Sequence, residues 1–159
     1  MRAKFGQPTD KEPTRYELRI GDYMRAIELS EAERQAVWAG IGSHKLLLGR
    51  TVKDIFLDNG TMPADREGRG DLWIFTSDAV SRHRTVKGDA ELEFISHRDV
   101  RVVSLTAHDS DIFSVGPHSA ISLHVEFVGH RLAELSAAGT NCLYLLTMFR
   151  KYFSRRMAP

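Results

Sequence analysis

Apolar and polar residues alternate along much of the second half of this chain. Residues 121–127 give the clearest case, because every second position there is apolar: Ile121, Leu123, Val125 and Phe127. The positions between them are Ser122, His124 and Glu126. Alternation with period two is typical of an antiparallel strand that buries one face and exposes the other. The pattern therefore predicts a half-buried strand over residues 121–127.

Similar but shorter patterns predict further strands. Their ranges are 52–57, 71–76, 79–86, 91–95, 100–105 and, as a last short strand, 131–135. Lys87, Gly88 and Asp89 fit a hairpin turn between two of these strands, since glycine adopts the backbone angles that tight turns require. We therefore expect an antiparallel sheet of about six or seven strands.

Patterns typical of helices precede and follow the predicted strands in the sequence. Ser30 and Glu33 form a capping box, which predicts a helix near 31–39 that ends at Gly40 and Gly42. At the other end, apolar residues recur at helical spacing from Cys142 to Phe153. Residues 1–15 read as a mobile arm, and residues 16–27 show a mixed pattern that predicts no element.

The order of these elements indicates an α+β fold. Strands followed by one helix favour a bent antiparallel sheet, or a partly open barrel, capped by the C-terminal helix. A length of 159 residues suits one globular domain, which we expect over residues 16–159, with the sheet and closing helix over residues 45–153.

This order resembles that of the bacterial pleckstrin-homology-like (PH-like) and GRAM-like domains. In that family, an aromatic strand with a polar turn precedes a strand with an Asp-Val step, and an amphipathic helix closes a bent barrel. The corresponding segments here are 72–83 (LWIFTSDAVSRH), 93–105 (EFISHRDVRVVSL) and 142–153 (CLYLLTMFRKYF). The basic residue that usually follows the turn is replaced by Ser77, Asp78 and Ala79, which weakens any transfer of the family's lipid-binding residues to this chain.

Composition narrows the possible partners and the compartment. The net charge is +1, so no overall field attracts nucleic acid. No apolar run is long enough to span a membrane, no secretory signal is visible, and the single Cys142 cannot form an internal disulfide. These features predict a cytoplasmic protein.

No residue pattern indicates a metal or cofactor. His118, His124 and His130 are six residues apart, which separates neighbours by about 20 Å on one strand, too far for a shared ion. Cys142 begins an apolar helix and is better explained as a buried residue than as a nucleophile. We therefore expect neither a metal nor a cofactor.

Two hypotheses of function remain. The first is a non-catalytic binding module that contacts a protein partner, a second copy of itself or an anionic lipid or phosphate group through exposed Arg82, Arg84 and Lys87. The second is a small enzyme or ligand-binding barrel with a pocket between the sheet and the C-terminal helix. The aromatic residues that would line that pocket are Trp73, Phe94, Phe127 and Phe149. The first is favoured, because aromatic residues usually form the core and no catalytic signature is present.

Overall fold

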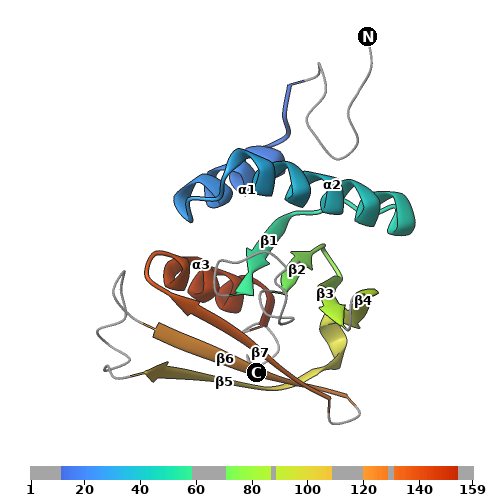
Figure 1. Ribbon diagram of the computed structural model, residues 1–159. Coiled ribbons are helices and arrows are strands. Elements are labelled where there is room, and N and C mark those ends of the chain that lie inside the picture. The colour runs from blue at the N-terminus through green and yellow to red at the C-terminus, as the bar shows by residue number, and fades with distance from the viewer. Residues whose placement is uncertain (1–11, 59–70, 87–88, 109–119, 129–130, 154–159) are drawn as a thin grey trace. The chain divides into compact units, whose positions relative to one another are not determined.

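The computed structural model describes residues 12–58, 71–86, 89–108, 120–128 and 131–153 (Figure 1). Two compact units share the chain: Met1–Ile55 with Ile74–Ser77, and Phe56–Trp73 with Asp78–Pro159. Most of the arm expected over residues 1–15 lies outside the described residues. Within them, no helix is long and apolar enough to cross a membrane.

The first unit contains two capped helices, α1 (Arg15–Ala26) and α2 (Glu31–Leu48). The sequence does not predict α1, although Thr14 and Glu17 form a capping box with the same geometry as that of Ser30 and Glu33. Each hydroxyl accepts the backbone N–H three residues ahead, and each glutamate accepts the N–H of its cap residue. The capping box of Thr14 and Glu17 therefore marks the start of α1.

The predicted end of α2 at residue 39 is wrong, because the helix continues for nine further residues, to Leu48. Gly40 and Gly42 lie inside it, at a cost of about 1 kcal/mol each relative to alanine. Burial of the apolar side chain of Ile41 on the same stretch favours the helix despite this cost. The residue that ends α2 is Gly49, whose φ of 65° is left-handed.

Two antiparallel sheets follow, and in the described part of the chain they do not close into a barrel. The four strands of the first are ordered β1 (Asp54–Leu57), β2 (Leu72–Phe75), β3 (Ala79–Val86) and β4 (Asp89–Ser96). A short 3₁₀ turn, His97–Asp99, leads to the second sheet, ordered β5 (Val100–His108), β6 (Ala120–Phe127) and β7 (Arg131–Ala138). The predicted hairpin turn includes Lys87 and Gly88, which lie outside the described residues.

The C-terminal helix closes the second unit. α3 (Asn141–Met148) continues into a π-helical turn, Phe149–Phe153, and lies on one face of the second sheet (Figure 1). Buried side chains of α3 and the turn include Cys142, Leu145, Met148 and Phe153. The α+β prediction, with an antiparallel sheet system capped by a C-terminal helix, is confirmed, and the arrangement is consistent with a PH-like fold.

Candidate functional site

The second sheet has one apolar and one polar face. On β6, Leu123 and Val125 are buried, whereas His124 between them is exposed. Directly opposed residues of neighbouring strands point to the same face, so the register places polar side chains in rows across the sheet. The two rows are Ser104, His124 and Glu134, and Thr106, Ser122 and Ser136.

A chain of hydrogen bonds links these rows. Nε2 of His108 lies 2.8 Å from Oγ of Ser122, which lies 3.4 Å from Oγ of Ser136. The hydroxyl of Ser136 donates to Oε1 of Glu134 at 2.9 Å, and Oε2 of Glu134 lies 3.8 Å from Nδ1 of His124. The carboxylate of Glu134 thus accepts from Ser136, is linked through it to Ser122, and lies next to His124.

The direction of this chain follows from its carboxylate end, because a hydroxyl group has a single proton. Ser136 donates to Glu134 and must therefore accept the proton of Ser122. Ser122 in turn accepts from Nε2 of His108. A base that activates serine must instead accept the serine proton. His108 and Ser122 are therefore not arranged as a catalytic pair.

A pocket of about 460 Å³ opens on the polar face. Its lining residues come from four strands: Arg82, Ser104, His124, Val125, Glu126, Leu132, Ala133 and Glu134. Leu132 is 76% exposed and lies opposite Glu126 in the register. The pocket therefore combines an apolar surface with carboxylates, and its volume falls within the range of about 300–1,000 Å³ that is common for ligand sites.

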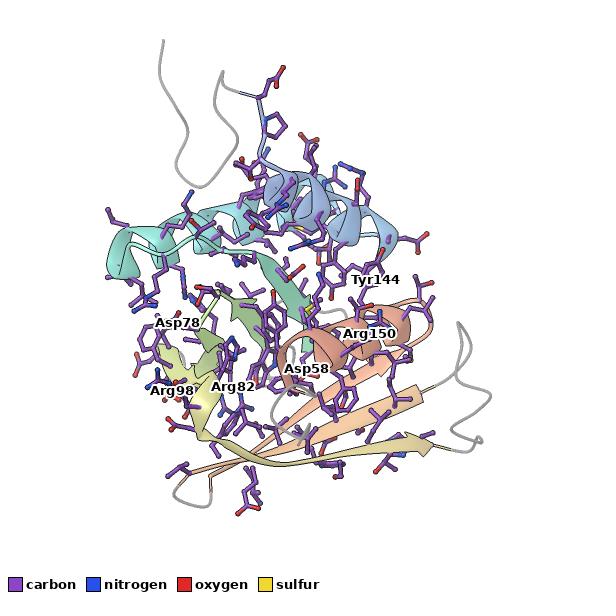
Figure 2. All side chains as sticks on the ribbon, turned by 180° about the vertical axis from the view of Figure 1, so that it is seen from behind. Asp58, Asp78, Arg82, Arg98, Tyr144 and Arg150 are labelled. Carbon is purple, nitrogen blue, oxygen red and sulfur yellow. The ribbon has the colours of Figure 1, made fainter. Side chains whose placement is uncertain are left out.

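Asp58 reaches from the end of β1 to the outer edge of β7. Its Oδ1 accepts the backbone N–H of Ser136 at 2.6 Å. Burial raises the pKa of Asp58 to about 6, and the charges of Asp71 and Glu134 raise it as well. The Ser136 N–H and the positive charge of Arg82 oppose that rise; Figure 2 labels Asp58 and Arg82. This carboxyl group therefore titrates closer to neutral pH than an ordinary aspartate.

Asp71 forms a salt bridge with Arg82 of β3. Nε of Arg82 lies 2.6 Å from Oδ2 of Asp71, and the two side chains are only 14% and 6% exposed. The Arg82 guanidinium also lies 5.2 Å from the centroid of the Trp73 ring, and Nε of Arg84 lies 4.0 Å from Oδ1 of Asp71. A largely buried carboxylate therefore compensates the charge of Arg82.

The three cations predicted to bind an anion have different environments. Arg82 and Arg84 share β3 and both approach Asp71, whereas Lys87 lies outside the described residues. Arg82 is therefore not the exposed cation that the sequence suggests. Anion binding through these three residues stays a prediction, and the pairing with Asp71 disfavours it.

The four aromatic residues of the alternative pocket do not share one environment either. Trp73 and Phe127 are 0% and 3% exposed and belong to the core, whereas Phe94 is 46% exposed. Phe149 is half-buried. None of the four lines the pocket on the polar face. A ligand cavity between sheet and α3 stays a prediction.

Within the described residues, the remaining candidates for chemistry give no reactive group. Cys142 is fully buried, and burial raises the pKa of its thiol, which opposes formation of the nucleophilic thiolate. Among the described residues, no three His, Cys, Asp or Glu side chains are grouped so that they could hold a metal ion. His118 and His130 lie outside that part of the chain.

Sequence reasoning does not identify Asp58, Glu134 and Ser136 as members of the site. Asp58 follows directly after the strand predicted over residues 52–57, and the last predicted strand ends at residue 135, which leaves out Ser136. The period-two pattern continues through Ala137, and following it would have placed Glu134 and Ser136 on the polar face. No local pattern indicates that Asp58 reaches β7.

No model of a known protein family matches the chain, and comparison with curated proteins finds no match. Any assignment of function therefore rests on the fold and on the residues of this site.

Proposed function

We propose that this protein is a non-catalytic binding module that recognises a protein partner through the pocket on the polar face of β5, β6 and β7. The observation that carries this proposal is the juxtaposition of exposed Leu132 with the carboxylates of Glu126 and Glu134 around a pocket of about 460 Å³. A concave pocket that combines apolar surface with a few polar groups directed into it is typical of a binding site.

The charges of the pocket favour a cationic group. The side chain of Glu134 is 54% exposed, so an incoming group can reach it. Arg82 lines the same pocket, but Asp71 compensates its charge. Lysine and arginine combine an apolar stem with a cationic end. A basic side chain of the partner would place its stem against Leu132 and its charge at Glu134.

A binding role agrees better with the hydrogen bonds than an enzymatic one. The proton order from His108 through Ser122 to Glu134 does not activate a nucleophile. The proposal includes a relationship of this chain to the PH-like domains. The order of four strands, three strands and a helix supports that relationship. Such domains commonly serve recognition rather than catalysis.

The proposal can be tested with isolated side-chain analogues. N-acetylarginine amide and N-acetyllysine amide are titrated into the ¹⁵N-labelled protein, and N-acetylglutamate amide is the charge-reversed probe. The two basic compounds are expected to bind weakly, in the millimolar range, and to shift the amide signals of Ser104, His124 and Glu134. The acidic compound is expected to leave these signals unchanged.

A matched pair of variants locates the binding site. Glu134→Gln removes one pocket charge and is expected to weaken binding of the arginine probe about fivefold, as for loss of a charge-assisted hydrogen bond. Glu91→Gln removes an exposed carboxylate of β4 that does not line the pocket, and should leave binding unchanged. Preference for the acidic probe, or an equal effect of both variants, would contradict the proposal.

Concentration-dependent light scattering would show whether the partner is a second copy of the chain.

A further inference from the structure

Three cationic side chains surround the ring of Tyr16 in the first unit. Cζ of Arg15 lies 4.9 Å, Cζ of Arg19 5.3 Å and Nζ of Lys53 5.8 Å from the ring centroid. Nη2 of Arg15 also donates to the Tyr16 hydroxyl at 2.9 Å. The start of α1 and the segment before β1 thus place three positive charges at one aromatic side chain.

One of the three cations is already paired. Nε and Nη2 of Arg19 lie 2.7 and 3.1 Å from the two carboxylate oxygens of Asp54, whose side chain is 4% exposed. Nη2 of Arg19 also donates to the backbone carbonyl of Lys53 at 2.8 Å. These contacts attach α1 to the segment that supplies Lys53 and hold the cluster together.

The other two cations have no acidic partner among the described residues. Neither Arg15 nor Lys53 forms an ion pair there, and Arg15 is exposed while Tyr16 and Lys53 are half-buried. The hydrogen bond from Arg15 lowers the pKa of Tyr16, and the charges of Arg15, Lys53 and Arg19 lower it as well. The Tyr16 hydroxyl therefore lies in a region of positive potential that reaches the solvent.

We propose that Arg15, Tyr16 and Lys53 form a binding site for a phosphate group. The guanidinium of Arg15 provides a planar set of donors, Lys53 provides a compact charge, and the tyrosine hydroxyl provides a further donor. A free phosphate ion and the headgroup of an anionic phospholipid offer the same oxyanion. The site uses none of the residues that line the pocket on the polar face, so it is independent of the proposed partner binding.

Titration of inorganic phosphate into the full-length ¹⁵N-labelled protein tests this site, with ionic strength held constant by chloride. Saturable shifts of the Arg15, Tyr16 and Lys53 amide signals are expected in the millimolar range. Arg15→Gln and Lys53→Gln should each weaken binding at least about fivefold, because each removes a charged donor. Tyr16→Phe keeps the ring next to the cations and should have a smaller effect.

Lys45→Gln is the matched control, since it removes an exposed cation of α2 outside the cluster. It should bind phosphate like the wild type. Co-sedimentation with phosphatidylglycerol vesicles, compared with phosphatidylcholine vesicles, distinguishes the two sources of phosphate. Vesicle binding that requires Arg15 and Lys53 assigns the site to a lipid headgroup, and phosphate binding without vesicle binding assigns it to a soluble ligand. Absence of both, or equal weakening by Lys45→Gln, would overturn the proposal.

Discussion

The ion pair of Arg82 and Asp71 is shielded from water on both sides, with exposures of 14% and 6%. Both groups have given up hydration, and their mutual attraction is only weakly screened. Removing one partner leaves the other charged and buried, which costs more than the intact pair contributes. These residues are therefore expected to affect folding more than surface charges do.

Replacement of Arg82 by methionine should lower the free energy of unfolding by about 3 kcal/mol, because Asp71 would remain buried with only the more distant Arg84 as a counter-charge. Arg84→Gln is the control: its side chain is 33% exposed and its Nε lies 4.0 Å from Asp71, so the loss should stay below about 1 kcal/mol. Urea denaturation at neutral pH measures both. Equal losses for the two variants would show that the Arg82 pair has no special role.

Asp58 makes stability depend on pH in a defined direction. Its pKa is about 6 in the folded chain against an ordinary value of 3.8, so the folded state binds the proton more tightly than the unfolded state. Stability should therefore increase as pH falls from about 6 toward 4. Above that window the folded chain bears the full cost of the buried charge, which is at most about 3 kcal/mol.

Asp58→Asn should therefore stabilise the protein at neutral pH by up to about 2–3 kcal/mol, because it removes the charge but keeps an oxygen that can accept the Ser136 N–H. Below about pH 4 the variant and the wild type should become equally stable. Chemical denaturation over this pH series provides the measurement. Asp58→Ala lacks the acceptor and should not be stabilising; a constant difference at every pH would refute the assigned cause.

At the level of elements, period-two strands were predictable because one face of each contacts the core. The C-terminal helix was predictable for the same reason, but only part of its buried face was: Cys142, Leu145 and Phe153 of the predicted stripe are buried. Regular helical spacing places Phe149 on that face, yet Phe149 is half-buried and Phe153 is fully buried. A π-helical turn has more residues per turn, which brings Phe153 onto the face of Met148, five residues earlier. Spacing rules for α-helices cannot show this irregularity.

Phe153→Ala should destabilise the fold by about 3–5 kcal/mol, as expected for a large side chain removed from a close-packed core. Phe149→Ala, in the same turn, should cost clearly less, because solvent already reaches its ring. Urea melts of the two variants give the comparison. A larger loss for Phe149 would mean that regular α-helical spacing, rather than the π-helical turn, determines which ring fills the core.

The candidate site was less predictable than the elements. Period two on β6 identifies Ser122 and His124 as members of a polar face, but the partners opposite them depend on strand register. Asp58 is separated from Ser136 by 78 residues, and only the tertiary fold brings the two together. Likewise, the ion pair with Asp71 changes the role of Arg82, although the local sequence presents an ordinary basic strand.

For the whole molecule, the boundary between the two compact units falls inside β1 and β2. Asp54 and Ile55 belong to the first unit, while Phe56 and Leu57, in the same strand, belong to the second. Unfolding of either unit would therefore interrupt strands that also supply the other. The expectation of one domain over residues 16–159 stays a prediction, and the shared strands favour a single cooperative transition.

Two tryptophans provide a direct test, since Trp38 lies on α2 in the first unit and Trp73 lies on β2 in the second. Trp73→Phe and Trp38→Phe each leave one fluorescent reporter. Circular dichroism first measures how much each tryptophan substitution itself changes stability. After correction for that change, the fluorescence of Trp38 and that of Trp73 should give the same denaturation midpoint. Adding Ser30→Ala, which removes the α2 cap at a cost of about 1 kcal/mol, should then lower both midpoints equally. A shift confined to the Trp38 reporter would instead mean that the first unit unfolds independently and that the chain contains two domains.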